Sequence, residues 1–397
     1  MFGLGRMLAE VGDRREKPQF PTRAAVVPAF VMQLCRLGSL NALEQMKGGS
    51  LWRQLSDSCL PSADTVGYVY ERIECKHLRR GLTEFYKKLR RNKALGTVMG
   101  FKAAVVDGHE LTASYKRCCE ECSVRTVHTA EGDALQYYHR VVALQLLGRR
   151  FQLLLDFELE RRGEDEVGAA MRLIRRVIRN APRAFSVLLL DSLYARAPVV
   201  KLSVAHHKDV IVVLKDERRD LLQDARGLFE TEPPKEFTRG RTHYQQWDME
   251  GFTTWPQVGR PMRVVRSLET TARRERKGKQ CNTTFQTRDW VWTTTLPAQQ
   301  VSTETIVGLG HARWRIENQA FNELCTFWHF DHIYRHHPNA ILAFLLTLAL
   351  AFNLFHVFWA RNLKPQLRVA YAKMHWANLI AAALRVLCFP HLFLHPP

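Results

Sequence analysis

The sequence predicts an α/β protein, with a mixed sheet, a β-rich insertion subdomain, and flanking N- and C-terminal helices. Three observations predict this class. Residues 101–215 alternate short apolar runs with helical stripes. Residues 216–300 break that rhythm with Pro, Gly and alternating β-like pieces, and helical patterning resumes at residue 303. Apolar runs interleaved with helices indicate a layered α/β core, and the interruption indicates an inserted, mostly β subdomain.

The core is expected to contain five strands and two helices. Its apolar runs are short and bounded by turn residues, which is typical of buried strands, whereas the helical segments repeat their apolar residues once per turn. In chain order we expect strands at 101–111, 137–147 and 150–159, a helix at 164–181, a strand at 185–195, a helix at 197–207, and a strand at 209–215.

The charge balance favours a polyanionic partner. The chain carries 58 Lys and Arg against 39 Asp and Glu, a formal net charge of +19. Such an excess attracts nucleic acid or an acidic membrane, although a generally basic proteome would also produce it. The densest basic runs, at 87–93 and 273–279, are interpreted as phosphate-contacting surfaces in preference to solvated faces.

The chain is accordingly predicted to have four parts. Helical patterning begins near residue 20, and PSADT at 61–65 is typical of a helix N-terminus. We expect an N-terminal helical, DNA-binding region at 1–98, the first part of the core at 99–215, the β-rich insertion at 216–300, and the rest of the core with C-terminal helices at 301–397.

One apolar segment raises the question of a membrane. Residues 340–359 have no formal charge over the length of a membrane span. Because Asn353 and His356 interrupt the run, a buried core helix is preferred and no membrane partner is expected. Residues 1–20 make a poor signal peptide, and nine mostly scattered cysteines favour a reduced, cytoplasmic protein.

Three carboxylates form the candidate catalytic site. Asp107 and Asp191 each follow an apolar strand, and strand ends converge at one edge of a parallel-type sheet. Each precedes a small residue, Gly108 or Ser192, which allows close approach of a ligand. Glu317, on a predicted helix after the sheet, would complete an oxygen-rich site for two Mg²⁺ or Mn²⁺ ions. A single aspartate at the end of a strand would more often cap a helix or a turn.

These three residues, each on the expected element, resemble the Asp-Asp-Glu triad of DDE-type bacterial insertion-sequence transposases, in the branch with a Tyr/Arg/Glu/Lys signature. The resemblance covers roughly residues 100–335, and 216–300 lies where that branch has a β-rich insertion. It implies an RNase H-like core and metal-dependent cleavage and strand transfer at double-stranded transposon ends. It also implies a dimer in the DNA complex, in a bacterial cytoplasm and on the nucleoid when bound to DNA.

The resemblance assigns one further residue and shows two departures. Arg313 matches the signature arginine, which contacts DNA in the family. Gly310 stands where the signature has tyrosine, and Leu324 where it has lysine, so a weakened grip on DNA ends is expected. Glu323 lies about 120° around an α-helix from Glu317, so it is not expected to share the site.

Basic residues of the insertion are the other predicted DNA contacts. An exposed basic run can neutralise backbone phosphates without reading sequence. The candidates are Arg273, Arg274, Arg276, Lys277 and Lys279.

A cysteine cluster is the candidate for a second metal. Cys118, Cys119 and Cys122 could bind Zn²⁺, although ordinary reduced cysteines in a loop are preferred because a second CxxC pair is missing. The fourth ligand would have to come from His109, His128, His139 or Cys281. For the histidine-rich stretch 331–338, a His-based metal site is conceivable, but a solvated or phosphate-facing turn before Pro338 is preferred.

The sequence therefore predicts a metal-dependent transposase. Two alternatives stay open: an RNase H-like nuclease without strand transfer, and an inactive DNA-binding descendant of a transposase.

Overall fold

The computed structural model describes residues 3–148, 150–277 and 280–389, and the chain divides into two compact units. The first unit comprises residues 1–96, 107–182 and 315–397, and the second comprises 97–106 and 183–314. Strand β1 (Ala103–Glu110) contributes its first half to the second unit and its second half to the first. The sequence-predicted four-part division stays a prediction.

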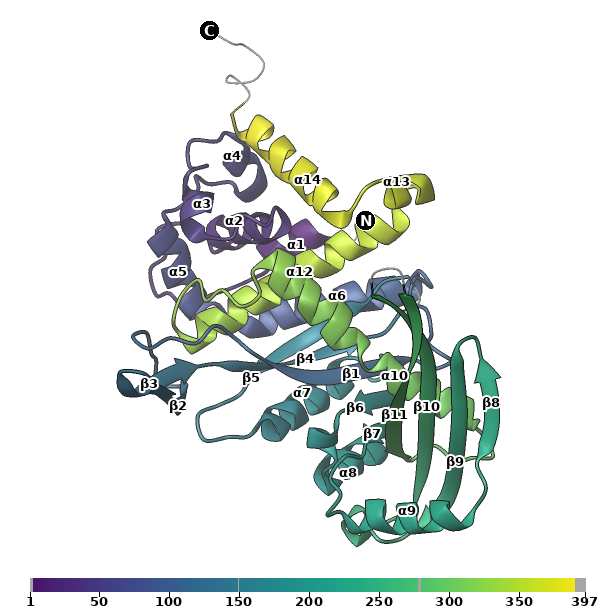
Figure 1. Cartoon of the computed structure of the whole chain (residues 1–397). Coiled ribbons are helices and arrows are strands. Elements are labelled where there is room, and N and C mark those ends of the chain that lie inside the picture. Colours follow the sequence, from purple (N-terminus) through teal and green to yellow (C-terminus); the bar gives the residue numbers. More distant parts are fainter. Residues whose placement is uncertain (1–2, 149, 278–279, 390–397) are drawn as a thin grey trace. The chain divides into compact units, whose positions relative to one another are not determined.

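The first unit is a helical layer packed on two core strands (Figure 1). Strand β4 pairs antiparallel with β5, and β2 and β3 form a separate two-stranded sheet. The strands are β2 (Ser123–Thr129), β3 (Gly132–Tyr138), β4 (Arg140–Leu146) and β5 (Leu153–Leu159). The helices are α1 (Leu4–Ala9), α2 (Arg23–Leu34), α3 (Leu40–Glu44), α4 (Leu51–Ser56), α5 (Ala63–Arg72), α6 (Cys75–Arg91), α7 (Glu166–Asn180), the π-helical η3 (Ile316–Phe321), α11 (Asn322–Trp328), α12 (Pro338–Arg361), α13 (Pro365–Ala370) and α14 (Lys373–Cys388).

The second unit is a sheet with the strand order β1-β6-β7-β11-β10-β9-β8. Strands β1, β6 and β7 are parallel, and the antiparallel strands β8 to β11 join them through β11 and β7. Its strands are β6 (Val187–Leu190), β7 (Asp209–Val213), β8 (Lys235–Arg239), β9 (Thr242–Phe252), β10 (Met262–Lys277) and β11 (Gln280–Thr294). Its helical segments are η1 (Ser192–Tyr194), α8 (Ala197–Ala205), α9 (Asp220–Thr231), η2 (Pro256–Val258) and α10 (Thr303–Ala312).

The predicted α/β class with a mixed sheet is confirmed. Each predicted core strand and helix is present, and the β-rich piece lies at 235–294 as predicted. Two elements were missed: the hairpin of β2 and β3, and helix α9 at the start of the predicted insertion. The hairpin is mostly exposed, so it has no apolar run by which to recognise it.

Helix α12 is the apolar centre of the first unit. It packs against α2, α5, α6 and β5 (Figure 1). It is the one helix of the described residues that is long and apolar enough to cross a membrane, and 83% of its most apolar window is buried inside the protein. The prediction of a buried helix is thus confirmed. Asn353, which interrupts the apolar run, bonds both backbone groups of Leu154 on β5, donating at 2.7 Å and accepting at 2.9 Å.

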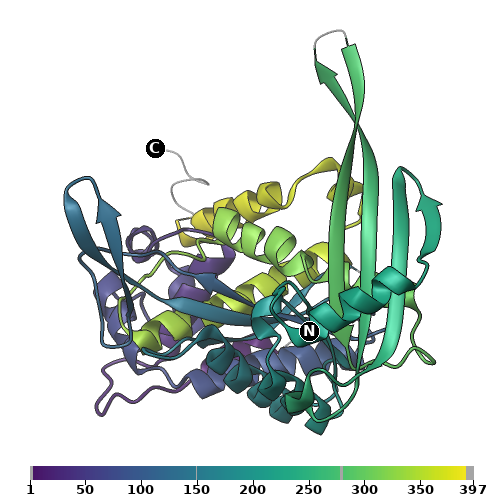
Figure 2. The same ribbon diagram turned by 60° about the horizontal axis from the view of Figure 1, so that its bottom comes forward.

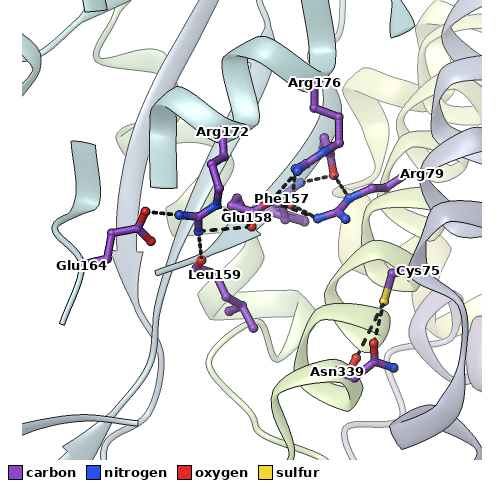
Figure 3. Close-up of polar contacts among 10 residues, drawn as sticks. Cys75, Arg79, Phe157, Glu158, Leu159, Glu164, Arg172, Arg176 and Asn339 are labelled. Carbon is purple, nitrogen blue, oxygen red and sulfur yellow. Dashed lines mark hydrogen bonds and ion pairs between the residues drawn. The ribbon is translucent and has the colours of Figure 1, made fainter. Parts of the chain in front are cut away.

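A buried ion network attaches two helices to β5 (Figure 3). Asp156 accepts from Arg79 of α6 at 3.0 Å and from Arg176 of α7 at 2.6 Å. Glu158 pairs with the same two arginines at 3.2 and 2.5 Å and with Arg172 at 3.3 Å. Burial alone would lower the pKa of Arg176, but the two carboxylates outweigh it and raise the pKa.

We expect Asp156→Asn to lower the free energy of unfolding by about 1.5–3 kcal/mol, because it removes one of the two carboxylates that pair with the half-buried Arg79 and Arg176. Urea denaturation of the intact chain measures this loss. Asp133→Asn, an exposed aspartate on β3, is the control and should change stability by less than about 0.5 kcal/mol. A loss from Asp156→Asn no larger than in the control would contradict the assigned role of the network.

Candidate functional site

The three predicted carboxylates are all half-buried. Asp107 is within β1 and Asp191 directly follows β6. Glu317 is the second residue of η3. Asp107 and Glu317 belong to the first unit and Asp191 to the second.

The two strands that lead to the aspartates are neighbours in parallel register. Ala103 pairs with Val187, Ala104 with Leu188, and Val105 with Leu189. Each aspartate is two residues beyond the last of these pairs in its own strand direction. The two strands are thus parallel neighbours, and Asp191 follows its strand as expected, whereas Asp107 lies inside β1, which continues to Glu110.

Glu317 lies in a π-helical turn, which the sequence did not predict. Helix α10 ends at Ala312, and after a short break the chain continues as η3 and then α11. π-helical turns are rare and frequently occur at functional sites, because the wider turn displaces a side chain from its α-helical direction. The buried Phe321 and Leu324 attach this segment to the core of the first unit.

The end of β1 packs against this helical segment through His109. His109 lies two residues after Asp107, so both side chains leave the strand on the same face. Its ring centroid lies 5.2 Å from that of Phe321, four residues after Glu317, and its Nε2 lies 3.4 Å from Sγ of Cys325. Within the first unit, the second half of β1 is thus packed against the helical segment that contains Glu317.

Asp331 fixes the orientation of His109. Its Oδ1 lies 2.6 Å from His109 Nε2 and 3.5 Å from Cys325 Sγ. The hydrogen bond from His109 outweighs partial burial and lowers the pKa of Asp331. Burial raises the pKa of the Cys325 thiol to about 12, and the Asp331 charge adds to the rise.

Two cations accompany Asp191. Nζ of Lys215, which closely follows β7, lies 3.4 Å from Asp191 Oδ1, and Nη2 of Arg313 lies 3.9 Å from the same oxygen. The Arg313 side chain is 1% exposed, and its guanidinium lies over the Trp314 ring at 4.3 Å. Arg313 therefore compensates the charge of Asp191 in this state, and its predicted DNA contact stays a prediction. Lys215 was not singled out from sequence.

Gly310, at the position of the signature tyrosine, has no room for a side chain. It is buried in α10, and an added Cβ would lie 2.5 Å from the indole of Trp292 on β11. A contact that short requires the neighbouring side chain to move, so the absence of tyrosine here is part of the packing of the second unit.

Glu323 pairs with cationic or hydrogen-bonding side chains of two other helices. Its carboxylate accepts from His356 at 2.9 Å and from Lys373 at 2.5 Å, which joins α11 to α12 and α14. Burial would raise the pKa of Glu323, but these two partners outweigh it and lower the pKa to about 2. Burial keeps the pKa of His356 below its ordinary value.

The predicted basic run lies at the far end of the β10–β11 hairpin (Figure 2). Strand β10 pairs with β9 only as far as Thr271, so from Ala272 onward it pairs with β11 alone as a two-stranded ribbon. Arg273 and Arg274 are exposed on this ribbon. The side chains of Arg276 and Lys277, and the whole of Lys279, lie outside the described residues.

Two of the three predicted cysteines belong to a four-residue cluster. Cys119 and Cys122 lie together with His139 and His336, their sulfur and nitrogen atoms all within 4.8 Å of one another. Cys118 is exposed and lies outside the cluster, as does His128. The expectation of a solvated or phosphate-facing turn at 331–338 is wrong for His336, whose Nε2 lies 3.2 Å from Cys122 Sγ.

Comparison with known families decides the classification. A family model described as "Transposase DDE domain" matches residues 105–354. The chain belongs to this family of transposases. No curated protein matches the chain. The mixed sheet and its helices form the RNase H-like core that the resemblance implied, and the match includes all three predicted carboxylates.

We expect the stability of this transposase to fall as the pH drops from about 5 to about 2, partly through Glu323. Its pKa of about 2 in the folded protein lies below the ordinary value near 4.3, so its contribution is present above the ordinary value and is lost as the carboxylate is protonated. Glu323→Gln should lower stability at pH 7 and flatten this acid dependence in urea titrations. The exposed Glu10→Gln is the control, and an unchanged acid slope in Glu323→Gln would refute the role of Glu323.

Proposed function

We propose that this protein is the DNA transposase of an insertion sequence, which cleaves the ends of its element and joins them to target DNA. The supporting observation is the family match over residues that include Asp107, Asp191 and Glu317. The packing of His109, two residues after Asp107, against Phe321, four residues after Glu317, supports the same assignment.

We propose Asp107, Asp191 and Glu317 as the metal-binding and catalytic residues. They fit Mg²⁺ or Mn²⁺ chemically, because half-buried carboxylates are the hard oxygen ligands that these ions prefer. When bound, such ions activate water and stabilise the leaving oxygen in phosphodiester cleavage. Lys215 and Arg313 compensate the charge of Asp191, so that this carboxylate is held in place before a cation binds.

We propose that the β10–β11 ribbon binds the DNA backbone. A two-stranded ribbon is narrow enough to enter the major groove of DNA. Arg273 and Arg274 are exposed there, opposite Thr284 and Thr283 in the hairpin register. The partner is double-stranded DNA at the element's ends and at the target, and the pairing of two ends favours a dimer in the complex.

The alternatives of a nuclease and of an inactive descendant are separated by one assay. Labelled element ends with Mg²⁺ would be cleaved and joined by a transposase, cleaved without joining by a nuclease, and bound without cleavage by an inactive descendant. The first outcome supports the proposal, and either of the others overturns it.

We expect Asp107→Asn, Asp191→Asn and Glu317→Gln each to reduce cleavage by roughly 10³-fold while leaving DNA binding intact, because several kcal/mol of transition-state stabilisation is lost. Cleavage of labelled ends is measured beside a gel-shift assay for binding. Asp133→Asn and Glu304→Gln, carboxylates on exposed surfaces, are matched controls that should retain activity. Full cleavage by any of the three variants would refute the triad assignment.

We expect Arg273→Ala with Arg274→Ala to weaken DNA binding and to reduce the slope of log K against log salt by about 0.9 for each phosphate that the protein no longer neutralises. Binding is measured by fluorescence anisotropy over a series of salt concentrations. A double variant of Arg175 and Arg179, two exposed arginines on α7, is the matched control. Equal slopes for both double variants would exclude the ribbon as the phosphate-binding surface.

A further inference from the structure

We propose that Cys119, Cys122, His139 and His336 bind one structural Zn²⁺ ion. The four residues come from three segments of the first unit: the loop before β2, the junction of β3 and β4, and the segment between α11 and α12. Two thiols and two imidazoles are a common ligand set of structural zinc sites.

Four of the six separations among the ligand atoms lie within about 0.4 Å of those in a tetrahedral zinc site, and all six are within 4.8 Å. With Zn–S near 2.3 Å and Zn–N near 2.05 Å, tetrahedral angles require S···S of about 3.8 Å and S···N of about 3.6 Å. The two sulfur atoms lie 3.7 Å apart. His139 Nε2 lies 3.3 Å from Cys119 Sγ and 3.4 Å from Cys122 Sγ, and His336 Nε2 lies 3.2 Å from Cys122 Sγ. To bind the ion, the three S···N separations would have to widen by a few tenths of an ångström.

The ligand set is complete, which indicates a structural and not a catalytic ion. Cys122 and His139 are buried, and Cys119 and His336 are half-buried. Four protein ligands complete the coordination of zinc, whereas catalytic zinc sites keep one position open for water or substrate. A sulfur separation of 3.7 Å is also far longer than a disulfide bond of about 2.05 Å.

The ion would join a weakly supported hairpin to the core. Strands β2 and β3 form a two-stranded sheet of their own, and such isolated hairpins are marginally stable. Cys119 and Cys122 precede β2 and His139 follows β3, so both ends of the hairpin would be attached to His336. His336 lies five residues after Asp331, which orients His109 beside the end of β1. Zinc would therefore also fix the segment that contains Asp331, and through it the position of His109 on β1.

Metal analysis of the full-length protein, purified under reducing conditions without added chelator, tests this proposal. We expect about one zinc per chain by mass spectrometry. Cys119→Ser, Cys122→Ser and His336→Ala should each lose most of it, since a structural site needs its full ligand set. Cys118→Ser and His128→Ala are matched controls, because both residues lie nearby in sequence but outside the cluster. They should keep the wild-type content.

Cobalt substitution keeps the test decisive if a variant folds poorly. Wild-type protein reconstituted with Co²⁺ should show the strong visible absorption of a tetrahedral thiolate site, which needs no ligand variant. Zinc below about 0.1 per chain together with no cobalt spectrum would overturn the proposal, as would a Cys119–Cys122 disulfide in the reduced preparation. Equal zinc loss in Cys118→Ser would overturn the ligand assignment. Failure here would leave the transposase assignment intact, because no proposed catalytic residue belongs to the cluster.

Discussion

The first unit depends on the burial of two carboxylates on β5. Asp156 and Glu158 would be costly to remove from water alone, since an unpaired buried charge destabilises a protein by several kcal/mol. Arg79 of α6 and Arg176 of α7 must both be present before the charges are balanced. The edge strand therefore forms together with an N-terminal helix and a core helix. These ion pairs, in addition to apolar packing, join the helical N-terminal region to the core strands. The N-terminal region therefore belongs to the same compact unit as β4 and β5.

Patterns confined to one element could be predicted from the sequence, and features assembled from several elements could not. The buried strands β1, β6 and β7 are short apolar runs, and α7 has a clear helical stripe, so each could be located. The β2–β3 hairpin is exposed on most of its surface and carries no such pattern. The π-helical turn at Glu317 has the same apolar spacing as an α-helix, so the sequence gives no sign of its wider turn.

The same distinction holds for the sites. Asp107 and Asp191 could be proposed because each ends an apolar run in the sequence, although β1 continues past Asp107 to Glu110. Lys215 becomes relevant only through its distance to Asp191. The CxxC spacing identifies Cys119 and Cys122 as possible metal ligands from the sequence alone. His336 lies more than two hundred residues later, and only the folded structure shows that it is close to them. Its neighbours in a histidine-rich, polar stretch resemble a solvated turn, which is why the expectation there was wrong.

Gly310 bears on whether this chain is a decayed copy of its family. A signature tyrosine lost by decay would leave a cavity, and cavities cost stability in proportion to their volume. Here the indole of Trp292 fills the space beside Gly310, and α10 packs directly on the sheet. The glycine is thus matched to its surroundings. If the proposed transposase function is correct, the exposed Arg273 and Arg274 are the residues of the second unit that we propose as DNA contacts. The packing at Gly310 is therefore no sign of decay in the second unit, and activity is decided by the cleavage and joining assay.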